Sequence, residues 1–358
     1  MPRETNRIIG VVCAALLALS LGLPAVAQAE VGVWITRDEI MQLPMTGESW
    51  DAVVEAAGGS ALNPDVSDQE DTTPVRVLAK AFVYVRTGNS RLRDEVIEAC
   101  RDAIGSEAGA RTLALGRNLI GYVVAADLVG LPADLDNDFR VWLRDLRTRD
   151  FETRTLVSTH EDRPNNWGTH AGASRLAIAV YLRDQGELDR AADVFHGWLG
   201  NRRIYAGFSY GDLSWQSDSN RPVGINPKGA LKDGHRIDGA LPDDQRRGGS
   251  FGWPAPRENY VWEALQGALA QAVILHRAGY DVWNWEDRAL LRAFEWLHEV
   301  NDYAAVGDDT WQPHVVNYYY GERFPAPVPS RHGKNVGFTD WTHRGGVEMS
   351  PAAPMLLP

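Results

Sequence analysis

Hydrophobic residues recur at helical spacing along most of the chain from Thr73 onward. Short segments that contain Gly, Pro or Asn interrupt the pattern, and it resumes after each of them. Long periodic segments joined by short turns are typical of antiparallel helical hairpins. The predicted helices cover residues 75–83, 92–104, 113–124, 139–143, 166–182, 188–199, 258–278 and 285–300.

The remaining segments lack this period. Residues 31–46 are expected to form an extended lead with a loop, before a helix that starts at Trp50 with Ser49 as its cap. The segment 200–256 is rich in glycine, and its aromatic and charged residues indicate an ordered, functional loop. The aromatic-rich segment 311–341 is also expected to be irregular.

No run of alternating apolar and polar residues is long enough to build a major sheet. Paired helices without a βαβ rhythm indicate an all-α protein. Hairpins without a clear short repeat favour an incomplete (α/α) toroid over a regular solenoid. The predicted organisation is a single toroid domain over residues 30–345, followed by a frayed tail over residues 346–358.

The first 29 residues have the pattern of a secretory signal peptide. Arg3 and Arg7 precede an apolar run over residues 8–27, and Ala27-Gln28-Ala29 forms an A-x-A cleavage site. Cleavage after Ala29 would make the protein secreted or periplasmic. The alternative is an uncleaved anchor, whose apolar core is near the lower length limit for spanning a bilayer. No later run is expected to span a membrane, so no membrane partner is expected after cleavage.

The formal net charge of −12 argues against nucleic acid as a partner, because the sequence has no basic stripe or arm. It does not exclude an anionic substrate, since a cleft can carry the opposite charge locally. Thirteen tryptophans supply faces that can stack on sugar rings, besides filling the core. Cys100 is the only cysteine of residues 30–358, so it is expected to be a buried thiol without an intrachain disulfide. We expect a monomer.

Motifs for metals and cofactors are absent from the sequence. It has no H-E-x-x-H, no C-x-x-C, no glycine-rich phosphate loop and no G-x-S-x-G. No cofactor and no catalytic metal are therefore expected. The alternative is a structural Ca²⁺ among Asp233, Asp238, Asp243 and Asp244.

Two polar segments could carry chemistry, and the first reads NNWGTH over residues 165–170. If a helix begins near Asn166, a spacing of four places Asn166 and His170 on one face, one turn apart. The next residues on that face, Ala173 and Ala177, are small, as expected for a cavity wall. The alternative is a helix N-cap by one of the two asparagines, with His170 as an ordinary polar neighbour.

The second polar segment reads HRIDGALPDDQRRG over residues 235–248, and Arg257 and Tyr260 follow at the head of a predicted helix. One stripe of this helix combines a phenol with small or polar residues, which suits a cavity lining. The alternative is a tyrosine that only anchors the helix start. The stripe consists of Tyr260, Ala264, Gly267 and Gln271.

The second segment resembles the alginate lyase superfamily. Those enzymes are α/α toroid polysaccharide lyases that pair an Asn-Asn-His segment with a later DGxLPxExxRG segment and a catalytic tyrosine. Here the motif is DGALP at residues 238–242 with Arg247-Gly248, and Tyr260 opens the next helix. The resemblance covers about residues 165–280, and the tail that ends in GFTDW at residues 337–341 is similar to the same group.

The sequence departs from the pattern of the mannuronate-type enzymes at three places. Trp167 stands where those enzymes have histidine, and His170 comes three residues later. Asp244 stands where the motif has glutamate, and the segment from Arg247 to Tyr260 is about six residues longer. The sequence is therefore more similar to the glucuronan and alginate lyase relatives with an NNWGTH motif.

The resemblance implies β-elimination in a β-1,4-linked polyuronate, in which the C5 proton is removed and O4 is expelled. Asn166, His170 and Arg247 would neutralise the carboxylate and stabilise the charge that develops. Tyr260 would act as base and acid if both groups depart on one face, whereas His170 or His235 would be the base if they depart on opposite faces. A phenol is a weak base at neutral pH, so nearby cations would have to activate it.

The sequence thus predicts an exported polysaccharide lyase that cleaves glucuronan or alginate without a metal. One alternative is a glycoside hydrolase on a similar scaffold, with two carboxylic acids such as Asp238 and Asp243 or Glu258 across the bond. The other is a non-catalytic polyuronate-binding protein. Predicted substrate-binding residues, which supply amide, aromatic or cationic groups, are Asn165, Trp167, His235, Arg257, Lys232, Trp253 and Tyr318.

Overall fold

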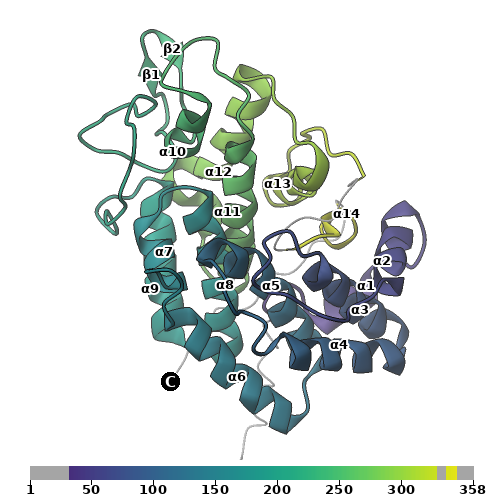
Figure 1. Cartoon of the computed structure of the whole chain (residues 1–358). Coiled ribbons are helices and arrows are strands. Elements are labelled where there is room, and N and C mark those ends of the chain that lie inside the picture. The colour runs from purple at the N-terminus through teal and green to yellow at the C-terminus, as the bar shows by residue number, and fades with distance from the viewer. Residues whose placement is uncertain (1–31, 329–335, 345–358) are drawn as a thin grey trace, which may run out of the picture.

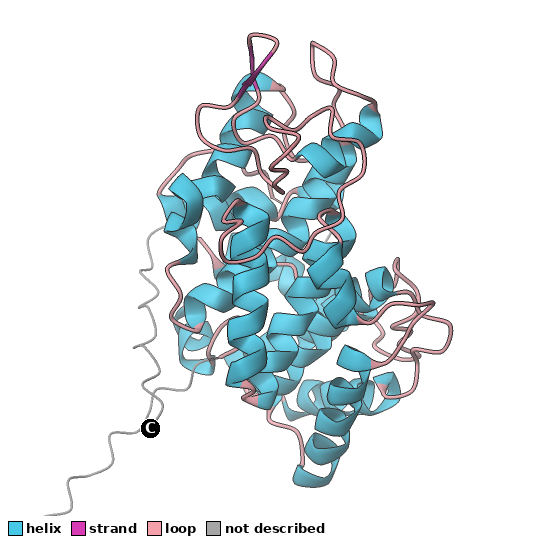
Figure 2. Ribbon diagram, turned by 90° about the vertical axis from the view of Figure 1, so that its left-hand side faces the viewer, coloured by secondary structure: helices cyan, strands magenta, loops and turns pink. Residues whose placement is uncertain are grey.

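The structure is a computed structural model that describes residues 32–328 and 336–344. Helices dominate the described residues, and the only strands among them are the two-residue β1 (Leu231–Lys232) and β2 (His235–Arg236), which pair antiparallel. Figure 2 shows this small hairpin at one end of a helical body. The predicted all-α class is confirmed. The predicted signal peptide and frayed tail lie outside the described residues.

Four long helices form the inner layer and pack side by side in chain order (Figure 1). They are α3 (Thr73–Thr87), α5 (Thr112–Val129), α8 (Asn166–Leu182) and α11 (Asn259–Arg277). Neighbours surround them almost completely. In α5, for example, every residue except Asp127 is buried. A helix without a polar face is typical of a position inside the fold.

Between successive inner helices the chain passes through the outer layer. The outer helices are α4 (Ser90–Ala103), α6 (Ala133–Thr148), α7 (Leu156–Asp162), α9 (Gln185–Leu199) and α12 (Trp285–Glu295). The longer ones bury one apolar stripe and expose the other face, as amphipathic surface helices do. This alternation of inner and outer helices is the layered arrangement of an incomplete α/α toroid.

Small residues let the inner helices approach closely. A Cβ atom on Gly116 of α5 would lie 2.7 Å from the carbonyl carbon of His170 in α8. A Cβ atom on Gly267 of α11 would lie 2.4 Å from the carbonyl carbon of Thr169. The predicted small-residue stripe of α11 therefore contacts the backbone of α8, and its glycine does not line a cavity. Ala173 and Ala177 of α8 are likewise fully buried, so their predicted place on a cavity wall is wrong.

The C-terminal segment connects the two ends of the inner row. α13 (Gln312–Tyr320) packs against α11, and α14 (Thr339–Thr342) packs against both α13 and α2 (Glu48–Gly58). The Trp341 ring lies 5.2 Å from that of Trp50, and its indole N–H donates to the Pro44 carbonyl at 2.8 Å.

Several helices differ from the sequence prediction, and one of them, α7, lies where no helix was predicted. Residues predicted as an extended lead contain α1 (Arg37–Gln42), which Thr36 and Glu39 begin with a capping box. α2 begins at Glu48 after Gly47, so Ser49 lies inside the helix and is not its cap. The segment predicted to be irregular contains α13. Helices of six to nine residues span too few turns for an apolar period to stand out.

The long segment 200–256 is irregular, as predicted, with β1, β2, α10 (Pro242–Gln245) and a 3₁₀ turn (Arg246–Gly248) as its only regular elements. Asp238 and Gly239 of the DGALP motif hold this loop against α12. Asp238 pairs with Arg292 at 2.6 Å, and Gly239 has φ +86° with a Cβ position only 2.0 Å from the Arg292 carbonyl oxygen. No other residue fits this close approach without strain. Beyond α11, further short turns cover Val282–Asn284, Trp296–Val300 and Gly307–Asp309.

Two expectations about the apolar part of the chain can be compared with the structure. Cys100 is a free, buried thiol as predicted, and burial raises its pKa to about 12. Among the described residues, α5 is long and apolar enough to cross a membrane, contrary to expectation. Its 18-residue window is 94% buried inside the fold, as in the core helix of an α/α layer.

Candidate active site

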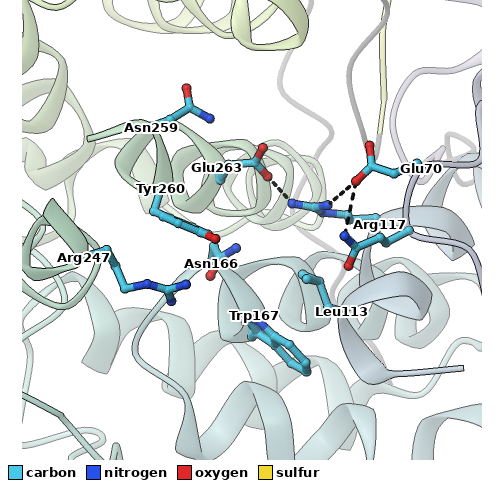
Figure 3. A pocket seen from close by; sticks show the side chains of 10 residues that line it. Glu70, Leu113, Arg117, Asn166, Trp167, Arg247, Asn259, Tyr260 and Glu263 are labelled. Carbon is cyan, nitrogen blue, oxygen red and sulfur yellow. Dashed lines mark hydrogen bonds and ion pairs between the residues drawn. The ribbon is translucent and has the colours of Figure 1, made fainter. Parts of the chain in front are cut away.

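A cavity of about 490 Å³ lies where the first turns of α8 and α11 meet α5 and the 3₁₀ turn Arg246–Gly248. Figure 3 shows the side chains that line it. The structure brings four residues predicted from the sequence to this one place, although they come from separate segments: Asn166, Trp167, Arg247 and Tyr260. The lining also includes Gln69, Glu70, Leu113, Arg117, Asn259 and Glu263.

The two adjacent asparagines have different roles. Asn165 is the N-cap of α8, and its side-chain oxygen accepts the Trp167 N–H at 3.2 Å while its amide donates to Asp243 at 3.1 Å. Asn166 is the first residue of the helix, and its backbone N–H donates to Asp244 at 3.1 Å while its backbone carbonyl accepts the Thr169 hydroxyl at 3.1 Å. The residue is 1% exposed, and its buried side-chain amide has no hydrogen-bond partner among the described residues. A buried amide without a partner is costly, so its place on the cavity wall marks it as a group for a ligand.

Asp243 and Asp244 hold this arrangement from the second motif. Asp243 forms an ion pair with Arg246 at 2.8 Å and also accepts the Gly211 N–H at 3.2 Å. Asp244 is almost fully buried. Burial raises the pKa of its carboxyl well above the usual range, the neighbouring Asp243 adds to that rise, and the Asn166 N–H opposes it. Neither residue was predicted from the sequence to have this positioning role, although both lie within the DGALP…RG motif.

The raised pKa of Asp244 predicts a pH-dependent stability. A carboxyl whose pKa is higher in the folded state stabilises the fold fully below its unfolded pKa, about 3.9, and this contribution is lost as pH rises through the folded pKa. We expect Asp244→Asn, which keeps the acceptor for the Asn166 N–H, to gain at least about 1 kcal/mol relative to wild type between pH 4 and pH 7.5. Urea denaturation at both pH values measures this, with the exposed Asp150→Asn as control. An equal difference at both pH values would contradict the prediction.

Tyr260 and Arg247 lie together on one side of the cavity. The Arg247 guanidinium stands over the Tyr260 ring, 3.9 Å from its centroid. The Tyr260 backbone N–H donates to the N-cap Glu258 at 3.1 Å, which fixes the start of α11. The ring is 38% exposed, and its hydroxyl end points toward Asn166 (Figure 3). The arginine therefore orients the ring through its face and leaves the hydroxyl open to the cavity.

The opposite side of the cavity holds a polar cluster that was not predicted from the sequence. Arg117 of α5 is 5% exposed and forms a close ion pair with Glu263 of α11 and a second one with Glu70 at 3.5 Å. The signal that could have revealed it is an arginine in the middle of the most apolar helix of the chain. A charge in such a place needs a partner.

His170 lies one layer behind this wall. Its side chain is fully buried, and its Nε2 atom lies 3.8 Å from the Glu263 carboxylate. The spacing of four does place it one turn after Asn166, but the backbones of α5 and α11 cover that part of α8. The structure therefore does not bring His170 to the surface of the cavity, and it contacts the cavity wall through Glu263.

The other predicted binding residues lie outside this lining, and their contacts with substrate remain predictions. The His235 ring stacks on Trp253, with centroids 4.4 Å apart, and the Lys232 ammonium donates to the Gln216 carbonyl at 3.0 Å. Arg257 pairs with Asp302 at 2.6 Å. The Tyr318 ring lies 5.4 Å from that of His343, on the side where the C-terminal segment packs.

Metal binding can be judged for the residues that the structure describes. Among them, no group of three or more His, Cys, Asp and Glu side chains could hold a metal ion. Two of the aspartates considered for Ca²⁺ are engaged elsewhere, Asp238 with Arg292 and Asp243 with Arg246. The described part of the chain therefore does not support that alternative.

A match to a known protein family includes the first polar segment, residues 165–170. The model of the alginate lyase family matches residues 89–208, a range that starts before α4, passes the end of α9 and includes Asn165, Asn166 and His170. The predicted resemblance to the alginate lyase family is confirmed over this matched segment. The matched segment includes Asn166 and Trp167 of the cavity lining, whereas Arg247 and Tyr260 come from the chain beyond it.

Two solved alginate lyases are similar to this chain. One is an alginate lyase from Bacteroides ovatus, with 12% identity and a TM-score of 0.45 over 70% of this chain and 66% of that one. The other is a histidine-to-alanine variant of alginate lyase A1-III complexed with a tetrasaccharide, with 11% identity and a TM-score of 0.49 over 88% of each chain. A search of curated proteins finds no match. The family assignment rests on the matched segment alone.

Proposed function

We propose that this protein is an exported polysaccharide lyase that cleaves a β-1,4-linked polyuronate, glucuronan or alginate, by β-elimination without a metal. The observation that carries the proposal is the meeting of Tyr260, Asn166 and Arg247 in one cavity. These residues supply an acid–base group, an amide without a protein partner and a cation, which are the groups that the reaction needs.

The elimination can be written with this chain's own residues. The oxygen of Tyr260, as phenolate, takes the C5 proton of the bound uronate. The electron pair of the C5–H bond forms the C4=C5 double bond as the C4–O4 bond breaks, and Tyr260 passes the proton to O4. Asn166 and Arg247 donate to the uronate carboxylate, where negative charge develops as C5 loses its proton.

The helix geometry supports the same assignment. Asn166 is the first residue of α8 and Tyr260 the second of α11, so both side chains stand at helix N-termini. The N-terminus of a helix carries partial positive charge and favours an anion beside it. The cavity therefore favours a carboxylate that gains charge during the reaction, although the whole chain carries a net charge of −12.

Ultraviolet absorbance of the unsaturated uronate product tests the proposal. The protein would be incubated with glucuronan, polymannuronate, polyguluronate and a neutral glucan, and we expect absorbance to rise with a polyuronate only. Reducing ends without absorbance would identify a hydrolase, although Asp238 and Asp243, nominated for that role, are held by Arg292 and Arg246. Binding without any product would identify a sugar-binding protein.

Export and assembly are part of the proposal. The pattern of residues 1–29 supports export to the periplasm or beyond, with cleavage after Ala29. Sequencing the N-terminus of the protein recovered outside the cytoplasm should give Glu30 as the first residue. Retention of the first 29 residues would instead indicate the anchor. A monomer without nucleic-acid or membrane partners remains a prediction.

A further inference from the structure

The two sides of the cavity differ in their chemistry. Tyr260, Asn166 and Arg247 stand on one side, and the cluster of Arg117, Glu263 and Glu70 stands on the other (Figure 3). The first side presents donors and a cation. The second presents two carboxyl groups around one guanidinium. A single substrate that touches both sides must therefore offer two kinds of group.

The cluster is arranged to offer hydrogen-bond acceptors. Arg117 is buried and engages both carboxylates, so its charge is matched within the cluster. Two carboxylates and one guanidinium have a formal charge of −1, which does not favour a further carboxylate. Carboxylate oxygens accept several hydrogen bonds each, and sugar hydroxyls are suitable donors. Glu263, held in place by Arg117, and Glu70 can thus bind hydroxyl groups.

We propose that the Arg117–Glu263–Glu70 cluster is a subsite for the hydroxyl groups of the sugar next to the reacting uronate. The inference rests on the proposed function and names its substrate class. In a polymer with equatorial β-1,4 linkages, each residue is turned over relative to its neighbour. One edge of the chain therefore presents the carboxylate of one residue and the O2 and O3 hydroxyls of the next.

That alternation matches the two sides of the cavity. The carboxylate lies against Asn166 and Arg247, and the neighbouring hydroxyls lie against Glu263 and Glu70. The preferred substrate is consequently a β-1,4-linked glucuronan or polymannuronate whose O2 and O3 hydroxyls are free. Acetyl groups on these oxygens remove the donors and add bulk at the cluster, and the axial α-1,4 linkages of polyguluronate do not give the same alternation.

Replacing Glu70 tests the subsite, because this side chain is 61% exposed and is not needed for the core. On the polymer that the wild type cleaves, in deacetylated form, we expect Glu70→Ala to raise KM about fivefold with kcat nearly unchanged. If the cluster bound a carboxylate through Arg117, removal of Glu70 would lower KM. Glu98→Ala on α4 is the matched control, because it removes the same charge from a side chain that is 59% exposed on the outer layer.

A second test uses a chemically modified substrate. We expect acetylation at O2 and O3 to lower kcat/KM of the wild type at least about tenfold. In Glu70→Ala we expect a smaller difference in kcat/KM between the acetylated and the deacetylated polymer. Three results would overturn the subsite while leaving the lyase intact. They are equal rates on the acetylated and the deacetylated polymer, a KM that falls or stays constant in Glu70→Ala, and a preference for polyguluronate. Absence of unsaturated product from every polymer would overturn the proposed function and the subsite with it.

Discussion

Tyr260→Phe is expected to lower kcat on the preferred polyuronate by about a thousandfold or more, because one hydroxyl serves as both base and acid in the proposed elimination. Loss of the hydroxyl leaves the ring in place, so the Arg247 guanidinium can still stack on it at its present 3.9 Å from the centroid. KM should therefore change less than about threefold. Initial rates of ultraviolet absorbance and titration of polymer binding measure the two effects separately.

A second tyrosine serves as the control for Tyr260→Phe. Tyr84 of α3 also has an arginine over its ring, with the Arg37 guanidinium 5.4 Å from the centroid, but it does not line the cavity. Tyr84→Phe should leave kcat unchanged. Retention of more than about a tenth of the wild-type kcat in Tyr260→Phe would show that another group is the base. In that case Glu263 and His170, which lie on and behind the opposite wall, become the groups to replace next.

Local chemistry made the start of α8 predictable. The expected helix over residues 166–182 has the observed bounds because an asparagine cap and an apolar run specify a helix without help from distant residues. The same holds for α11, which was expected over residues 258–278 and begins at Asn259 behind its cap Glu258. The meeting of Asn166 with Arg247 and Tyr260 could not be derived this way. It followed only from the resemblance of two motifs to a known family.

The cluster across the cavity could not be predicted, because it depends on how inner helices pack. Arg117 and Glu263 are 146 residues apart and belong to α5 and α11, and their pairing is decided by the packing of these helices around α8. His170 shows the same limit. Spacing correctly placed it on the face of Asn166, but α8 lies between two other inner helices, and helical spacing alone does not tell which part of a face remains open.

The structure also explains why the irregular loop carries the second motif. Its Asp238-Gly239 fastens the loop to Arg292 of α12, and its Asp243-Asp244 pair holds the start of α8. The loop thus connects the outer layer with the cavity and places Arg247 over Tyr260. The aspartates and the glycine of the motif therefore hold the loop in place, whereas Arg247 lines the cavity.

The adjacent asparagines should respond in opposite ways to alanine. Asn166→Ala is expected to lower kcat by a factor of about 10² to 10³, because it removes a donor placed where charge develops. It should not destabilise the fold, since its amide has no partner among the described residues.

Asn165→Ala is the matched comparison, because it removes the N-cap of α8 and the contact with Asp243. It should lower the free energy of unfolding by about 1 kcal/mol. Urea denaturation and initial rates on both variants separate the two roles. If Asn166→Ala were as unstable as Asn165→Ala, its amide would have a structural role and the loss of activity could not be assigned to the substrate carboxylate. If the buried amide of Asn166 serves only to bind a ligand, Asn166→Ala will have an unchanged or higher free energy of unfolding and a strongly lowered kcat.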